Sequence, residues 1–522
     1  MSGPAECSRR QFLRRMLVGA AFAGPFVAGC SVSGGDQGIL GRKVPGQTGL
    51  MVLGASVPES FTVPLAIPPV LRPVQTVGRT DHYELTVRAA LQEIVPGLET
   101  PIWGYNGEFP GPLIESQRGR RVVIHTRNEL PAPVSTHLHG GRTPAADDGY
   151  PTDLLLPAQG WEHGHEHSGA ISHGERDYTY PLDQRAALLW YHDHRMDFTG
   201  PQVWRGLAAM HIHRDDEEAA LGLPTGEYEL PLMVTDRSFG RDGRFLYPSR
   251  DPELVSPPGV LPDFANGVLG DVLLVNGVPA PFHPVSRGVY RLRIVNASNA
   301  RHYRFELVPA PPGREPFLLI GSDGGLLAAP VELRSFALAP SERADVLVDF
   351  SSFSAGENVV LRNRYGDEHC SDVLQFRVGS ELGPSYSTPP VLSHLERLDE
   401  SQAVRTRTFH FARRNQHDGA LWPIGGHLFD PDHIAAAPAL GDTEIWQLSS
   451  DLRHPFHIHH VPFQVLDIPG VDTYGWKDTL ALGLRGSARV IIRFDGYRGK
   501  YTFHCHTYEH EDMGMMANYA IT

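Results

Sequence analysis

Three similar stretches, each a turn glycine followed by an apolar strand, restrict the possible folds of this chain more than any other feature. They cover residues 119–128, 288–296 and 441–449. Two further stretches, 341–350 and 487–494, resemble each other at a later position in the repeat. Self-similarity of this kind indicates a repeated structural unit. The repeats therefore predict three similar domains, at about 60–215, 225–385 and 400–522.

The composition indicates what kind of unit is repeated. The chain has 522 residues with 44 prolines and 54 glycines, which separate many short runs of β-forming residues. Such spacing is typical of all-β sandwich or barrel modules. The net charge of −14, with no basic patch after the first fifteen residues, argues against a nucleic-acid partner. We therefore predict three β-sandwich domains in a protein that binds no nucleic acid.

The N-terminus has the features of an export signal. Arg9 and Arg10 precede an apolar run from Met16 to Gly29, an order typical of the twin-arginine signal, so we expect residues 1–29 to be a signal segment. Residues 30–59 suit a flexible linker. Cys30 follows small residues as in a lipobox, and the pattern fits either a lipid anchor or a chance match. We expect a periplasmic or cell-surface protein.

Closely spaced histidines occur in the first and third repeats but not at the matching places of the second. They are His137, His139, His192 and His194 in the first, and His454, His457, His459, His504 and His506 in the third. Alternate residues of a strand face the same side, so a His-x-His pair presents two imidazoles together. Four such pairs would bring eight histidines to one metal centre, and the middle domain would be a spacer without metal.

Cys505 lies between two of these histidines, so its side chain must point away from theirs. It would then face a second metal, with three residues joining the two sites. A thiolate with two imidazoles and a distant thioether is the ligand set of a blue copper site. Cys505, His454, His510 and Met515 can supply that set. Zinc or solvent-exposed histidines would explain one pair, but not four pairs and a cysteine at repeated positions.

These residues resemble the multicopper oxidases, and within that family the spore-coat-type bacterial laccases and the bilirubin oxidases. Five other stretches look like the same subgroup: 102–112, 148–151, 320–326, 475–479 and 510–512. The resemblance implies three cupredoxin-like Greek-key β-sandwich domains and four copper ions, one of type 1, one of type 2 and two of type 3.

The resemblance also implies a role for each residue. The type 1 ligands are the four named above, and the type 2 ligands are His137 and His457. The type 3 ligands are His139, His192, His194, His459, His504 and His506. Asp148 and Glu511 match carboxylates that deliver protons, although a turn aspartate and a surface glutamate would fit the sequence equally well.

The implied reaction is a one-electron oxidation of phenols or aromatic amines coupled to reduction of dioxygen to water by a monomeric laccase-like enzyme. A cuprous-ion oxidase is an alternative, but no methionine occurs between Met233 and Met513 to bind Cu(I). A bilirubin oxidase is another, although Leu452 replaces the tryptophan of its type 1 motif. A cupredoxin-fold scaffold of the cell envelope is the non-enzymatic alternative. The histidine-rich stretch 163–173 fits a solvated loop better than a copper-capturing one.

Overall fold

The computed structural model describes residues 49–50, 57–161, 169–366, 370–416, 419–469 and 473–522. The predicted signal segment 1–29, Cys30, most of the linker 30–59 and residues 163–168 of the histidine-rich stretch lie outside the described residues. The described chain is mostly β-strand, which confirms the all-β prediction. Among the described residues no helix is both long and apolar enough to cross a membrane.

The first domain is built from two sheets that enclose a core of alternating inward residues such as Leu85, Ile124 and Leu138. The larger sheet contains β2 (Gln75–Val77), β3 (Thr80–Glu93), β4 (Glu99–Tyr105), β6 (Arg121–Asn128) and β10 (Glu175–Tyr180). The smaller contains β5 (Ile114–Gln117), β7 (Thr136–His139), β11 (Ala187–Asp193) and β12 (Ala208–Arg214). The short strands β8 (Leu154–Leu156) and β9 (Ile171–His173) pair beside them.

The middle domain has the largest sheet and an apolar core of its own. That sheet contains β13 (Glu229–Arg237), β15 (Val272–Val275), β16 (Val278–Pro279), β18 (Val289–Asn296), β20 (Phe317–Ser322), β21 (Gly325–Leu333) and β23 (Arg343–Asp349). The opposing sheet contains β17 (Phe282–Arg287), β19 (Tyr303–Val308), β22 (Phe336–Leu338), β24 (Asn358–Asn363) and β25 (Asp372–Leu382).

The third domain repeats the two-sheet arrangement. One sheet contains β26 (Ala403–Phe411), β30 (Thr443–Ser450), β32 (Phe463–Asp467) and β34 (Ser487–Arg493). The other contains β29 (Ile434–Ala436), β31 (His454–Ile458), β33 (Thr479–Leu482), β35 (Gly499–Cys505) and β36 (Met516–Ile521). A small hairpin joins β27 (Arg414–Gln416) to β28 (Gly419–Leu421). In the described part of the chain the α-helices are short: α2 (Thr199–Trp204), α3 (Asp216–Ala220) and α4 (Tyr508–Asp512).

The three repeated stretches occupy equivalent places in the structure. They form β6, β18 and β30, and each pairs in parallel with an early strand of its own domain, namely β3, β13 or β26. A turn glycine followed by an apolar strand therefore marks the same structural position three times.

The segment before β2 differs from the sequence-based division. Gly49–Leu50, inside the predicted linker, form β1 and pair in parallel with β14 (Val268–Leu269). Farther along, the backbone N–H groups of Phe61 and Leu65 donate to carbonyls of the middle domain at 2.7 Å. This stretch therefore lies along the middle domain, because its backbone groups find partners there rather than in the first sandwich.

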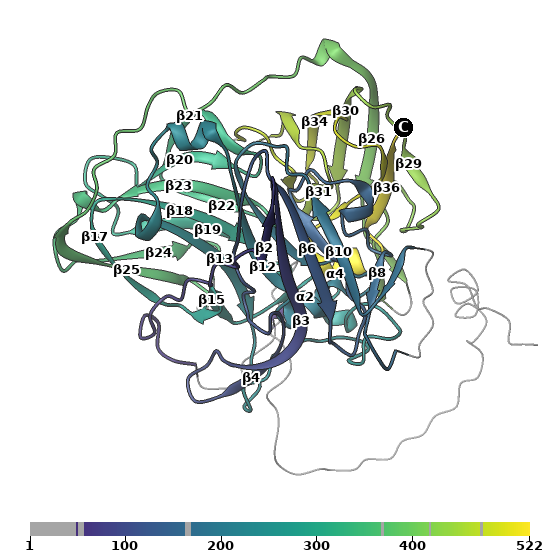
Figure 1. The fold of residues 1–522 in the computed structure, drawn as a ribbon, viewed down its shortest axis with the longest axis horizontal. Coiled ribbons are helices and arrows are strands. Elements are labelled where there is room, and N and C mark those ends of the chain that lie inside the picture. Colours follow the sequence, from purple (N-terminus) through teal and green to yellow (C-terminus); the bar gives the residue numbers. More distant parts are fainter. Residues whose placement is uncertain (1–48, 51–56, 162–168, 367–369, 417–418, 470–472) are drawn as a thin grey trace, which may run out of the picture.

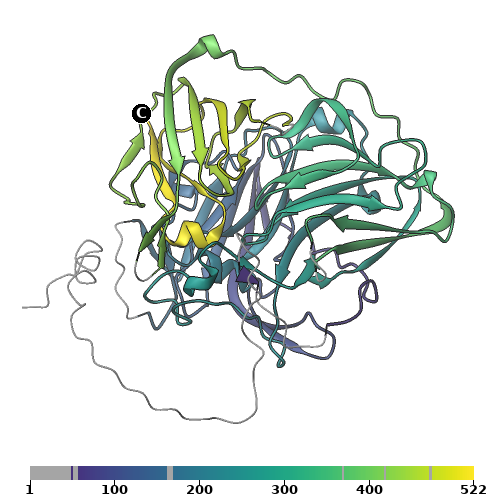
Figure 2. The ribbon, with the colours of Figure 1, turned by 180° about the vertical axis from the view of Figure 1, so that it is seen from behind.

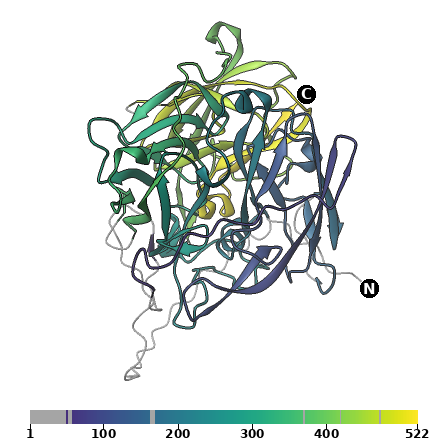
Figure 3. The same cartoon turned by 60° about the vertical axis from the view of Figure 1, so that its left-hand side comes forward.

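Figure 1 shows the three domains around a common centre, with the middle domain in teal and green and the third in yellow-green. Seen from behind, the yellow helix α4 lies where the domains meet (Figure 2). The view turned by 60° places the dark blue first domain beside the third (Figure 3). Strands β7 and β11 of the first domain and β31 and β35 of the third carry the clustered histidines.

Candidate metal centres

Eight histidines from two domains meet in a single buried cluster. Two come from β7, two from β11 and its end, two from β31 and its end, and two from β35 and its end. Strand register sets His137 opposite His192, and His457 opposite His504. Each of the eight is at most 1% exposed: His137, His139, His192, His194, His457, His459, His504 and His506.

Three of these rings point the same nitrogen at one another. The Nε2 atoms of His194, His459 and His504 lie 3.1–3.2 Å apart. The Nδ1–H of His459 donates to Asp148 at 2.7 Å and that of His504 faces Glu511 at 3.0 Å, so in the neutral rings Nε2 carries a lone pair. Converging lone pairs repel each other unless a cation lies among them. This arrangement fits a metal ion.

Three more rings have their outer nitrogen fixed in the same way. The Nδ1 atoms of His137, His192 and His457 donate to backbone carbonyls at 2.6–2.9 Å. Their Nε2 atoms are buried without a hydrogen-bond partner. A buried polar atom without a partner is costly, and a metal ligand whose other nitrogen is held by a carbonyl is a common solution.

The remaining two rings face each other across the cluster. His506 Nε2 lies 3.2 Å from His139 Nδ1, and His139 Nε2 lies 3.0 Å from the Asp478 carboxylate. The His139 ring stacks on His457 at a centroid distance of 3.8 Å. His139 therefore presents Nδ1 to the cluster, with Asp478 holding its outer nitrogen.

A second donor set lies on the other side of β35. Cys505 Sγ is 3.4 Å from His454 Nδ1 and 3.5 Å from His510 Nδ1, and these two nitrogens are 3.1 Å apart. All three residues are at most 2% exposed. A sulfur with two imidazole nitrogens is a donor set that suits copper.

The three methionines near Cys505 lie in different surroundings. Met515 is fully buried in the same apolar cluster as Cys505, and its backbone N–H donates to the His510 carbonyl. Met513 belongs to this cluster too, but it is less deeply buried and its side chain lies beside Gly259, whereas Met516 packs in a separate cluster with Tyr150. Of the three, Met515 is the one whose surroundings fit the sulfur site best.

Two residues cover the imidazoles of this second site. The Trp422 ring stacks on His510 at 3.7 Å and is itself fully buried. Asp451, whose side chain is 33% exposed, lies 3.1 Å from Nε2 of His454. The partly exposed Asp451 separates the His454 ring from solvent, whereas the buried Trp422 ring covers His510.

Asp148 and Glu511 both contact the histidine cluster. Asp148 binds His459 through its carboxylate and His137 through its carbonyl, and Glu511 bridges His194 and His504 at 3.3 and 3.0 Å. Glu511 lies on α4 and is 1% exposed, so the reading of a surface strand-end glutamate was wrong. The sequence did not predict α4, which starts two residues after His506.

Burial controls the protonation of these groups. It lowers the pKa of every cluster histidine for which a shift is resolved, for example to about 3 for His192. It also raises the pKa of the Cys505 thiol and brings that of Asp148 to about 7. For Glu511, burial acts upward, but His194 and His504 outweigh it and lower the pKa to about 2. A lowered pKa favours the neutral imidazole, which is the form that binds a metal.

One His-x-His pair outside the predicted set shows that spacing alone is not sufficient. His211 and His213 lie on β12, fully buried, and both contact the Ser116 hydroxyl at 2.7 and 2.9 Å. They belong to none of the groups of possible metal-binding residues found in the described chain. Strand spacing brings two imidazoles to one face but does not say which face meets a second pair.

Comparison with known proteins agrees with this geometry. Models of the multicopper oxidase family match residues 87–218 and 396–522. A laccase of Bacillus subtilis is 35% identical over 89% of this chain and 99% of its own length. The chain belongs to the multicopper oxidase family.

Other relatives support this placement. A bilirubin oxidase of Albifimbria verrucaria is 33% identical to this oxidase, over 88% of this chain and 81% of its own. The crystal structure of a laccase from Pediococcus acidilactici superposes with a TM-score of 0.76 at 32% identity, covering 90% and 95% of the two chains. The three cupredoxin-like domains are thereby confirmed. This oxidase is a laccase-like, copper-dependent enzyme that uses oxygen and a reducing substrate.

Proposed function

We propose that this oxidase holds four copper ions, one at the sulfur site and three among the eight histidines. The type 1 ligands are Cys505, His454, His510 and Met515. The type 2 ligands are His137 and His457, and the type 3 ligands are His139, His192, His194, His459, His504 and His506. The observation that carries this proposal is the convergence of the His194, His459 and His504 lone pairs at 3.1–3.2 Å.

When bound, the coppers would take electrons singly from a reducing substrate and supply four to each dioxygen, which becomes water. The chain joins the two sites by adjacent residues, since Cys505 belongs to one site and its neighbours His504 and His506 belong to the other. The mostly buried surroundings of both sites exclude bulk water from the ligands.

Asp148 and Glu511 are the proposed proton carriers. Each carboxylate touches an outer nitrogen of a cluster imidazole, so each lies where it would pass protons on toward the cluster within one hydrogen bond. The Thr199 hydroxyl donates to Glu511 at 2.7 Å and thereby orients it. Thr143 does the same for Asp148 at 3.3 Å.

The proposed substrates are phenols and aromatic amines, which would dock beside the His454 ring. Asp451 is the partly exposed group there, and its carboxylate accepts a hydrogen bond from the Nε2–H of His454 and would accept another from a substrate hydroxyl. Such substrates need an apolar surface with an acceptor at its edge, and the partly buried Leu452 packs next to this position.

A copper-loaded preparation tests the proposal. We expect four coppers per chain, an intense blue colour, and oxygen uptake that is fastest with phenols and aromatic amines in a panel that also contains bilirubin and Cu(I). Fastest turnover of Cu(I) or bilirubin would favour the metal-oxidase or bilirubin-oxidase alternative. A colourless protein without copper would instead indicate a scaffold role.

For the cell, we propose export by the twin-arginine route, which would carry this oxidase to the periplasm or cell surface as a monomer. The Arg9-Arg10 pair before the apolar run supports export, and Cys30 supports a lipid anchor. Replacing both arginines with lysine should retain the protein in the cytoplasm. Labelling with a radioactive fatty acid would show whether Cys30 is lipidated.

A further inference from the structure

Three sequence stretches that supply none of the proposed copper ligands meet at one edge of the histidine cluster. They are 320–326 and 341–350 in the middle domain and 475–479 in the third. Lys477 contacts Asp323 at 2.9 Å and Glu342 at 3.2 Å, so a cation of the third domain is paired with two carboxylates of the middle domain. These contacts fix the chain around Asp478 on the middle domain.

Arg343, the first residue of β23, forms the central contact between the two domains. Its Nη1 and Nη2 donate to the two carboxylate oxygens of Asp478 at 2.6 and 2.5 Å. Its backbone N–H donates to Asp323 and its Nη2 also to the Asp323 carbonyl, at 2.8 and 3.0 Å. The two-point contact fixes the plane of the Asp478 carboxylate as well as its position.

Asp478 in turn holds two histidines of the cluster. Its carboxylate contacts His139 Nε2 at 3.0 Å, and its carbonyl accepts from His457 Nδ1 at 2.9 Å. Thr479 reinforces the arrangement, since its hydroxyl lies 2.9 Å from the Asp478 carboxylate. One residue therefore sets the ring orientation of a histidine from each of the two copper-binding domains.

The position of this pair explains why an arginine is needed. A bidentate guanidinium can bind both carboxylate oxygens while leaving a lone pair for the His139 N–H. The side chains of Arg343 and Asp478 are only 1% and 7% exposed, so each is satisfied mainly by the other. Without Arg343 the carboxylate would be free to turn or to take up a proton, and His139 would lose its fixed acceptor.

We propose that Arg343 is a positioning residue for the copper cluster, acting through Asp478 to orient His139 and His457. The middle domain is then more than a spacer, because it fixes one side of the cluster without contributing a ligand. This inference rests on the proposed copper assignment of the eight histidines. Partners of this kind commonly change metal affinity by about 10- to 100-fold.

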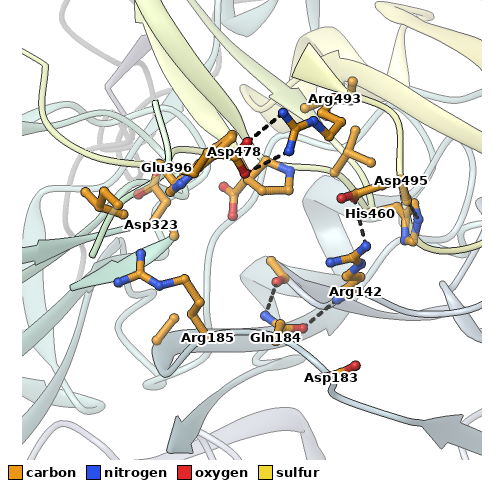
Figure 4. Close-up of a pocket in the computed structure, with 18 of the residues that line it drawn as sticks. Arg142, Asp183, Gln184, Arg185, Asp323, Glu396, His460, Asp478, Arg493 and Asp495 are labelled. Atoms are coloured by element: carbon orange, nitrogen blue, oxygen red, sulfur yellow. Dashed lines mark hydrogen bonds and ion pairs between the residues drawn. The ribbon is translucent and has the colours of Figure 1, made fainter. Parts of the chain in front are cut away.

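A cavity reaches the same place from outside. Its volume is about 270 Å³, and Figure 4 shows Asp478 and Asp323 on one side of it and Arg142, Gln184 and His460 on the other. Arg343 does not line this cavity; it holds Asp478 from the middle-domain side. Removing the guanidinium would thus expose a loosened Asp478 to the water in the cavity.

The test compares Arg343→Gln with Arg291→Gln in the full-length, copper-loaded protein. Arg291 is a matched control, since it lies in the same sheet, is 2% exposed, and pairs with Asp345 at 2.5 Å away from the cluster. Arg343→Gln should keep the blue absorption but bind cluster copper about 10- to 100-fold more weakly. Its type 2 electron paramagnetic resonance signal should also change. Arg291→Gln should lose stability without either change.

The possible results separate the inference from the function on which it rests. A wild-type protein that binds copper nowhere in the cluster would refute the proposed function itself. If the wild type loads fully and Arg343→Gln shows the same copper content and resonance signal, the inference alone is overturned. The same holds if Arg343→Gln shows only the loss of stability that Arg291→Gln shows. If Arg343→Gln does not fold, Arg343→Lys decides: it keeps the charge but cannot bind both oxygens at once. An unchanged type 2 signal in Arg343→Lys would likewise overturn the inference.

Discussion

His211 and His213 should make this oxidase less stable as the pH falls from 7 to 5. Burial lowers the pKa of His211 to about 3 and that of His213 to about 4, against about 6.5 for an exposed histidine. Below pH 6.5 the unfolded chain therefore binds protons at both residues while the folded chain does not, and stability falls with pH. The loss ends only near pH 3–4, where the folded state is protonated too.

The size of the effect follows from these pKa values. Between pH 7 and pH 5 each imidazole removes about 2 kcal/mol of unfolding free energy, so the pair removes about 4. That is a large fraction of the roughly 5–15 kcal/mol that stabilises a typical domain. In the double variant His211→Gln/His213→Gln the difference in unfolding free energy between pH 7 and pH 5 should be smaller by about 4 kcal/mol.

Urea unfolding followed by circular dichroism at pH 7, 6 and 5 would measure this difference. Ser116→Ala is the control, since it removes the hydroxyl between the two rings but leaves both imidazoles buried. Its pH dependence should remain as steep as that of the wild type. If the double variant were destabilised by acid just as strongly as the wild type, other groups would carry the effect and the reasoning would fail.

Three substitutions test the copper assignments. Cys505→Ser should abolish the blue absorption, because the colour would come from copper bound to the Cys505 sulfur. The circular dichroism spectrum should stay unchanged, since the substitution removes little buried area. A variant that remains blue would refute the assignment. His457→Ala should remain blue but consume oxygen at least about 100-fold more slowly, since its ring belongs to the cluster; oxygen uptake and absorbance measured together would show this. Met515→Leu should raise the reduction potential in a redox titration, because it removes a weak axial donor to Cu(II). Met513→Leu should not, as that side chain lies beside Gly259.

Much of the fold could be predicted because the repeats carry strong local signals. A turn glycine followed by an apolar strand predicted β6, β18 and β30, and each of these strands pairs in parallel with an early strand of its own domain. The start of the first domain could not be predicted in this way. Phe61 and Leu65 bond to the middle domain through their backbones, and backbone pairing leaves no mark in the side-chain pattern. Helix α4 is only five residues long, too short for a helical period to appear.

The candidate site could likewise be predicted only where the local sequence pattern carries the signal. Alternation along a strand explains why His137 and His139 share a face and why Cys505 points away from its neighbours. Spacing would have selected His211 and His213 as well, and the structure places them elsewhere. Residues that hold the ligands are harder to find, because Asp478 and Arg343 are 135 residues apart and belong to different domains. Nothing in the local sequence of either one indicates the other.

Because two domains share the cluster, copper binding and the docking of those domains stabilise each other. His137 and His192 come from the first domain and His457 and His504 from the third, so neither domain alone can surround a metal ion with these ligands. Copper would bind the assembled cluster but not the separated domains, so its binding free energy would stabilise the docked arrangement of the two domains. Asp512 also joins the two domains, because it accepts hydrogen bonds from the backbone N–H groups of Thr199 and Gly200 at 2.8 and 2.9 Å. These hydrogen bonds hold the first and third domains in register beside the ligands that the two domains share.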